Sequence, residues 1–91
     1  MVADGTRYER HMASFRIAHR HEADECPVVY AAWRGIDSPL RGETTISTCR
    51  WGDHQIWWDL DVADQDEAMS YLPPYVADRA VALRIGPVDI P

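Results

Sequence analysis

Residues 54–62, HQIWWDLDV, are the stretch of sequence that decides the fold. Apolar and polar side chains alternate along it, and a period of two is typical of a β-strand with one buried face. One face would carry His54, Ile56, Trp58, Leu60 and Val62. The other face would carry Gln55, Trp57, Asp59 and Asp61. The stretch therefore predicts a half-buried strand, around which the other elements can be placed.

The residues that follow it predict a helix and a last strand. Asp64 followed by Glu67 has the pattern of a capping box, so a short helix should run on to Tyr71 or Leu72, where two prolines break it. Residues 80–90, AVALRIGPVDI, alternate again and predict the last strand, with one face made of Val81, Leu83 and Ile85. We expect its Gly-Pro pair to form a bulge or kink.

The residues before it predict a strand and a longer helix. Residues 14–22, SFRIAHRHE, alternate, and one face of that strand would carry Phe15, Ile17, His19 and His21. Residues 24–35, DECPVVYAAWRG, begin a helical stripe made of Val29, Ala32, Trp33 and Ile36. Asp24 is placed to cap this helix, Pro27 suits its first turn, and Gly35 suits a left-handed end.

Two stretches remain. Residues 44–51, TTISTCRW, are β-branched and polar and predict an edge strand, which a tight turn at Gly52 and Asp53 would follow. Residues 1–12, MVADGTRYERHM, are polar and lack a period, so we expect a flexible N-terminal tail. The alternative is an ordered arm that pairs with a partner subunit. A single domain is expected over residues 13–91, as the length of 91 residues suggests.

The predicted order of elements is β-α-β-β-α-β, the split βαβ or ferredoxin-like pattern of the α+β class. Both crossovers should be right-handed. The expected architecture is a four-stranded antiparallel sheet with strand order 4-1-3-2 and both helices on one face.

Composition excludes several classes of function. Nine arginines, no lysine and fifteen acidic residues give a net charge of −6, so there is no basic excess for nucleic acid or an anionic membrane. No apolar run is long enough to span a membrane and no signal peptide is evident. We therefore expect a cytoplasmic protein. Two cysteines are too few for a disulfide scaffold, and a bond between them is not expected in a reducing compartment.

In this topology, residues with metal-ligand chemistry converge on one rim of the sheet, where the first strand ends, the first helix starts and the third strand begins. They are His19, His21, Cys26, Cys49 and His54. Three imidazoles with one or two thiolates suit zinc, nickel, copper or iron. The spacing matches neither HExxH nor CxxC. The placement nevertheless predicts a transition-metal site.

Plainer interpretations of the same residues stay open. His21 could be solvated at the rim, and His19 could be a core histidine with its hydrogen bonds satisfied. Cys26 could be a small apolar residue, a metal ligand or a reactive thiolate, because a helix N-terminus lowers a thiol pKa. Asp24 and Glu25 oppose that lowering.

Other chemical patterns are weaker. Four aromatic residues could line a pocket, although at this spacing they are more often core: Tyr30, Trp33, Trp58 and Tyr71. An acidic run looks suited to calcium but misses the EF-hand pattern, and capping explains it better: Asp59, Asp61, Asp64, Asp66 and Glu67. No Walker A, GxGxxG or GxSxG motif occurs.

The sheet face opposite the helices would be open in a two-layer domain. We expect it to carry Arg16, Ala18, Arg20, Trp57, Asp59 and Arg84. An exposed Trp57 among mixed charges suggests a covered surface, and both arginines of the first strand could pair with Asp59. The sequence therefore predicts a symmetric homodimer that packs sheet against sheet. The alternative is a monomer with an amphipathic outer face.

The order of elements over residues 14–90 resembles the dimeric α/β-barrel superfamily of ferredoxin-like proteins. The most similar part is residues 72–91, LPPYVADRAVALRIGPVDIP, a second helix broken by prolines and then a final strand. This superfamily includes antibiotic-biosynthesis-type monooxygenases, muconolactone isomerase-like enzymes and small metal-binding members. The resemblance implies a pocket between sheet and helices and a sheet-to-sheet dimer. No catalytic motif of those enzymes matches residue by residue.

Three functions follow as hypotheses. The first is a small pocket-containing protein that binds a transition metal through the five His and Cys residues. The second is a cofactor-free monooxygenase or isomerase for a small organic substrate, with His54 or His19 as general base, because an imidazole pKa lies near neutrality. The third is an interaction module whose product is the dimer itself.

Overall fold

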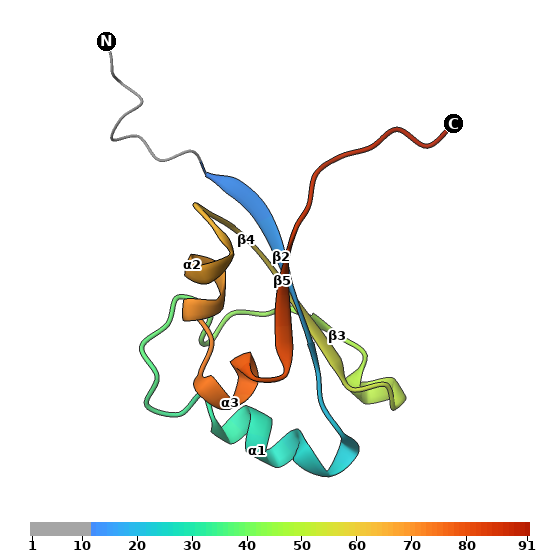
Figure 1. The fold of residues 1–91 in the computed structure, drawn as a ribbon. Coiled ribbons are helices and arrows are strands. Elements are labelled where there is room, and N and C mark those ends of the chain that lie inside the picture. Colours follow the sequence, from blue (N-terminus) through green and yellow to red (C-terminus); the bar gives the residue numbers. More distant parts are fainter. Residues whose placement is uncertain (1–11) are drawn as a thin grey trace.

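The computed structural model describes residues 12–91, which form a four-stranded antiparallel sheet with helices on one side of it (Figure 1). The strands are β2 (Ala13–Arg20), β3 (Ile46–Ser47), β4 (Gln55–Val62) and β5 (Ala80–Arg84). The α+β class and the four-stranded antiparallel sheet are confirmed. The expected tail lies outside the described residues, except for Met12, which is exposed.

The sheet order is β3-β4-β2-β5, which reads β5-β2-β4-β3 from the other edge. The central strand β2 pairs antiparallel with β4 and with β5. Ile17 of β2 stands opposite Trp58 of β4 and Ala82 of β5, and all three are buried. This register places the predicted apolar faces of 14–22 and 54–62 on the side that the helices cover (Figure 1).

The helical elements are short. They are the 3-10 turns η1 (Ala23–Glu25) and η2 (Cys49–Trp51) and the helices α1 (Cys26–Ala31), α2 (Gln65–Ser70) and α3 (Pro74–Ala77). The predicted helix over 24–35 ends early, because the next amides bond three residues back, as Trp33 does to Tyr30 and Arg34 does to Ala31. Gly35 adopts the expected left-handed conformation. No helix in the described part of the chain is long and apolar enough to cross a membrane.

The second helix begins as its sequence predicts. The Asp64 side chain accepts a hydrogen bond from the Glu67 amide at 2.8 Å, and the Glu67 carboxylate accepts one from the amide of Ala63. The chain then turns at the prolines, but it starts a further helix, α3, that the sequence analysis missed. Proline lacks the amide hydrogen that a first helical turn leaves unpaired, so Pro74 can begin a helix as well as end one.

Both outer strands are shorter than predicted. In 44–51 only β3 pairs with β4, because the amides of Trp51 and Asp53 turn back to the Thr48 carbonyl. In 80–90 the strand stops at Arg84. After a hydrogen bond from the Ile85 amide to the Ser14 carbonyl, the chain leaves the sheet without the expected bulge.

The last strand also faces the other way from the prediction. Val81 and Leu83 stand opposite Ala18 and Arg16, so they belong to the open face, while Ala82 is buried under the helices. Arg84 stands opposite Phe15 and therefore lies on the helix side, so its predicted place on the open face is wrong. A pair of small alanines flanking Val81 suits the covered face, because helices pack closely there.

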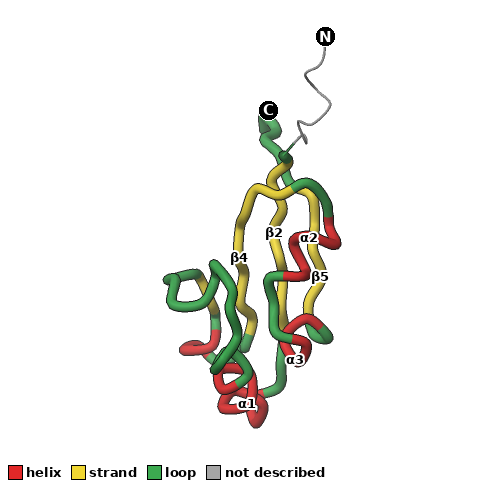
Figure 2. The backbone as a smooth tube through the Cα atoms, turned by 90° about the vertical axis from the view of Figure 1, so that its left-hand side faces the viewer, coloured by secondary structure: helices red, strands yellow, loops and turns green. Residues whose placement is uncertain are grey.

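The helices cover the sheet unevenly (Figure 2). Helices α2 and α3 lie over β2 and β5, whereas α1 lies across the lower end of the sheet and irregular chain passes beside β4. The buried core joins residues of the strands, of the helices and of the turn between α2 and α3: Phe15, Ile17, Ile56, Trp58, Val62, Ala82, Val29, Ala68, Leu72 and Val76. The half of the sheet near β3 is therefore covered by loop rather than by helix.

Candidate metal centre

Four side chains from distant parts of the sequence meet at one rim of the sheet. One potential ligand atom from each of His21, Cys26, Cys49 and His54 lies within 4.8 Å of those of the other three. We call these residues the four-residue cluster. They are the convergence that the topology predicts, and two nitrogens with two sulfurs form a donor set that could hold a transition-metal ion.

The spacing of these atoms fits tetrahedral coordination. Nε2 of His21 lies 3.2 Å from Sγ of Cys26 and 3.8 Å from Sγ of Cys49. Sγ of Cys26 lies 3.2 Å from Nδ1 of His54. Around zinc, bonds of about 2.0–2.3 Å in a tetrahedron hold neighbouring ligand atoms about 3.3–3.8 Å apart. These three distances lie close to this range, while the cluster as a whole spans up to 4.8 Å, so side-chain shifts would complete a tetrahedral site.

The end of β2 and the start of α1 supply the first two candidate ligands. His21 follows the last residue of β2, and its amide donates to the His54 carbonyl at 3.1 Å, which ties the two histidine segments together. Cys26 is the first residue of α1, just after η1 has reversed the chain. The Glu22 amide donates to the Glu25 carboxylate at 2.9 Å and the Glu25 amide donates to the Glu22 carbonyl, and these bonds hold the reversal in place.

The β3–β4 connection supplies the other two ligands. Cys49 opens the turn η2, and the Thr48 carbonyl and hydroxyl bind amides on the far side of the turn, including that of Gln55. His54 has a φ of 45°, a left-handed conformation that few residues other than glycine adopt. Strained backbone of this kind is concentrated at functional sites, where the surroundings hold it.

A chain of hydrogen bonds fixes which nitrogen of His21 is free. Nδ1 of His19 lies 3.2 Å from the Val76 carbonyl, which can only accept, so Nδ1 carries the hydrogen. In neutral His19, Nε2 is then an acceptor, and it lies 2.9 Å from Nδ1 of His21. His21 therefore donates through Nδ1, which leaves the Nε2 lone pair directed at the two sulfurs. Metal-binding histidines commonly have such an outer partner.

Burial keeps these histidines in the form that binds metals. His19 is 1% exposed and His21 is 4% exposed. Desolvation lowers the pKa of His19, and desolvation followed by the charge of His54 lowers the pKa of His21. Both imidazoles are therefore neutral at physiological pH, as a metal ligand must be.

The thiol of Cys26 is not an activated nucleophile. Burial, and next the neighbouring Cys49, raise its pKa, which is opposite to the lowering that a reactive thiolate needs. Both cysteines are free rather than disulfide-bonded. Of the three interpretations of Cys26, its position favours the metal ligand.

The structure separates the five predicted metal residues into four and one. His19 stands behind His21 and presents no free ring nitrogen to the cluster, because Val76 and His21 occupy both. One sequence signal was overlooked: the ligands form the mirrored spacings H-x4-C at 21–26 and C-x4-H at 49–54. Short intervals of this kind recur in zinc sites. Among the described residues, the acidic run 59–67 forms no comparable group.

The predicted aromatic pocket exists with a different lining. Tyr30, Trp33 and Trp58 line a groove beside the four-residue cluster. Tyr71 does not line it; the Tyr71 carbonyl accepts a hydrogen bond from Ser38 and its ring packs against the core. The loop 40–45 completes the groove, and nothing in its irregular sequence indicated this.

Comparison with known proteins gives no match: no family model, no curated protein and no solved structure is similar to this chain at a significant level. The functional argument therefore rests on the geometry of the site.

Proposed function

We propose that the protein binds a transition-metal ion through His21, Cys26, Cys49 and His54, and that zinc is the ion that fits best. The observation that supports this most directly is the gathering of two nitrogens and two sulfurs within 4.8 Å of one another. A tetrahedral S2N2 donor set favours zinc among the divalent first-row metals.

Four protein ligands close the coordination sphere, as in structural zinc sites, whereas catalytic zinc keeps a position for water. The ion would join the end of β2, the start of α1 and the β3–β4 connection. A thin core and short helices make such a clamp valuable in a domain of this size. The proposed role of the metal ion is therefore to stabilise a small domain that carries a groove beside the metal site.

The test is metal binding by untagged protein. Cobalt(II) serves as a spectroscopic stand-in for zinc, and we expect one ion per chain, visible bands typical of tetrahedral sites and a thiolate charge-transfer band. Cys49→Ser should weaken the charge-transfer band, while Arg50→Ala, a change at its exposed neighbour, should leave the spectrum unchanged. Failure to bind cobalt or zinc at micromolar concentration would exclude the proposal.

A cofactor-free enzyme is a weaker second candidate. It needs a histidine nitrogen that can reach a substrate, and both nitrogens of His19 are engaged in the interior. His54 is half-buried, with Nδ1 directed at Cys26. The same histidine serves the metal proposal better, because its neighbours are ligands rather than groups that bind a substrate.

The proposal includes a symmetric dimer and a distant relation to the dimeric α/β-barrel superfamily. The open face of the sheet exposes three apolar side chains by 50–59%: Ile46, Val81 and Leu83. On the same face, β2 carries Arg16 and Arg20, and the adjacent β4 carries Asp59 and Asp61. Within the chain, Arg16 pairs with Asp59 at 2.7 Å, while Arg20 lies 3.8 Å from Asp53 instead of reaching Asp59.

The charged and apolar residues of the open face are self-complementary about one particular two-fold axis. An axis parallel to the strands, between β2 and β4, places the arginines of one copy over the aspartates of the other. It also places Ile46 over Val81 and Leu83 of the other copy, because β3 and β5 are the two edges. An axis across the strands would instead stack like charges.

Sedimentation at micromolar concentration tests the dimer. We expect the mass of two chains, and Trp57→Glu, on the open face, should reduce it to one. Arg84 lies on the other side of the sheet, so Arg84→Glu should leave the mass unchanged. A wild-type mass of one chain would refute the dimer without touching the metal proposal. The compartment that suits two free thiols is the cytoplasm.

A further inference from the structure

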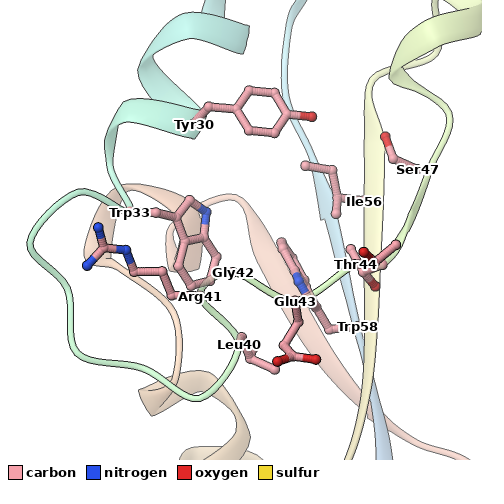
Figure 3. A pocket seen from close by; sticks show the side chains of 11 residues that line it. Tyr30, Trp33, Leu40, Arg41, Gly42, Glu43, Thr44, Ser47, Ile56 and Trp58 are labelled. Carbon is pink, nitrogen blue, oxygen red and sulfur yellow. The ribbon is translucent and has the colours of Figure 1, made fainter.

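A groove of about 440 Å³ lies over the half of the sheet that no helix covers (Figure 3). Its walls include three aromatic rings, which belong to Tyr30 in α1, Trp33 in the turn after it and Trp58 in β4. The Trp33 and Trp58 rings have centroids 5.7 Å apart and planes inclined by 49°. They form a corner, and they stand too close for a flat ring to slide between them.

The charges around the groove are one-sided. Glu43 lies at the lower end beside Leu40, and its carboxylate has no hydrogen-bond or ion-pair partner among residues 12–91 (Figure 3). Arg41 also belongs to the lining, but its guanidinium points away past Trp33 and donates to the Ile36 carbonyl at 3.4 Å. The groove therefore presents an unpaired carboxylate, in a chain whose net charge is already −6.

We propose that this groove binds a small organic cation, an alkylated or quaternary ammonium group carried by a small molecule. The faces of Trp and Tyr rings attract such cations, and a quaternary ammonium group has no N–H to donate to a hydrogen-bonding site. The ammonium would lie in the aromatic corner, with Glu43 balancing its charge and Leu40 and Ile56 contacting its apolar part. The volume lies within the range of small-molecule sites and leaves room for more than a trimethylammonium group.

This inference goes beyond metal binding and does not require it. The two sites nevertheless share a wall. The Tyr30 hydroxyl donates to Sγ of Cys49 at 3.7 Å, and the Ser47 hydroxyl accepts from the Cys49 amide at 3.0 Å. Both Tyr30 and Ser47 line the groove, so the β3–β4 connection that holds Cys49 also shapes the ligand site.

The test compares choline with 3,3-dimethylbutan-1-ol, in which a carbon replaces the charged nitrogen and the shape is kept. The protein is used as purified, and the indole N–H signals of Trp33 and Trp58 are followed by NMR. We expect choline to shift both signals saturably and to bind about tenfold more tightly than the alcohol, as cation–π contacts predict. Equal binding of the two, or no shift with choline up to tens of millimolar, would overturn the proposal.

A charge-removing variant sharpens the result, since Glu43 is exposed and its replacement does not threaten the fold. Glu43→Gln should weaken choline binding several-fold and leave alcohol binding unchanged. Asp66→Asn, at an exposed carboxylate in α2 outside the groove, should change neither. If Glu43→Gln left choline binding intact, the assigned role of the carboxylate would be wrong. If choline does not bind to protein that still binds cobalt, the groove proposal fails and the metal proposal is unaffected.

Discussion

The two halves of the covered sheet face are built differently. Over β2 and β5, the helices α2 and α3 and the turn between them bury Ala68, Leu72 and Val76 against the sheet, and these residues are at most 6% exposed. Over β4 and β3, loop residues such as Leu40 and Trp33 are only partly buried and leave a groove. The four-residue cluster lies at the rim where β2 meets β4.

The difference shows which half of the covered face is densely packed and which half leaves space for a ligand. A helix presents its apolar stripe at a constant spacing, so it can fill the space over a sheet without voids. A loop satisfies its backbone hydrogen-bonding groups in local turns. It therefore packs less densely, and polar side chains such as Glu43 remain at the groove. A metal ion at the rim would stiffen the half that lacks helices.

The largest expected effect is on the free energy of unfolding, from a substitution in the half that α2 and α3 cover. Ile17 is fully buried at the centre of β2, so Ile17→Ala should destabilise the protein by about 2–5 kcal/mol through lost burial and a cavity. Leu40→Ala, on the loop of the other half, should cost about 1 kcal/mol or less, because its side chain is only partly buried. Urea unfolding measures both, and equal costs would mean that the two halves are equally packed.

Adding metal should stabilise the half of the covered face over β4 and β3. Zinc at 100–1,000 times its dissociation constant should stabilise the fold by about 3–4 kcal/mol, because only the folded chain gathers the ligands. Hydrogen exchange shows which amides the bound zinc stabilises. The amides of η2 and of the first turn of α1 should become more protected than those of α2. Uniform protection of both halves would contradict a local clamp.

Removing the outer histidine should have a smaller effect than removing a ligand. His19→Leu takes away the acceptor that holds the His21 tautomer, so zinc affinity should fall about 10–100-fold. Competition with a chromophoric chelator measures this. Cys49→Ser should lower the affinity further, and an equal loss in the two variants would make His19 a ligand instead.

The smallest effect is expected at acidic pH, in the contact that links Glu25 of η1 to α3 and the residues just after it. Hydrogen bonds from the Glu22 backbone, from Tyr75 at 2.6 Å and from Arg79 at 2.8 Å lower the pKa of Glu25 from 4.5 to about 2. This contribution is complete above pH 4.5 and is lost as the pH falls toward 2.

Glu25→Gln should therefore flatten the pH dependence of metal-free stability between pH 4.5 and 3, as followed by urea unfolding at each pH. The exposed Asp37→Asn serves as the control and should keep the wild-type slope. A wild-type slope in Glu25→Gln would show that this link does not contribute to acid stability.

The alternating stretches were sufficient to locate β2 and β4, and the capping pair at Asp64 was sufficient to start α2. The same local signals failed at the edges. Nothing in 80–90 says that its partner strand β2 begins at Ala13, so the length and the facing of β5 were misjudged, and Arg84 with them. The helix α3 and the turn η2 were missed because prolines and β-branched residues suit more than one conformation.

The candidate site was partly predictable for a related reason. Placing strand ends and a helix start at one rim brought together the residues of the four-residue cluster, but it could not separate His21 from His19. His19 lies in β2 and His21 just after its end, and only the Val76 carbonyl from α3 shows that His19 is the one whose ring is turned away from the cluster.

By itself, the sequence determined the periods, the caps and the inventory of ligands, because these depend on neighbours within a few residues. Tertiary structure alone decided which nitrogen faces the sulfurs, how far apart the ligand atoms lie, and that a loop rather than a helix covers β4. Those features depend on packing between segments that are distant in the sequence, so no local pattern can specify them.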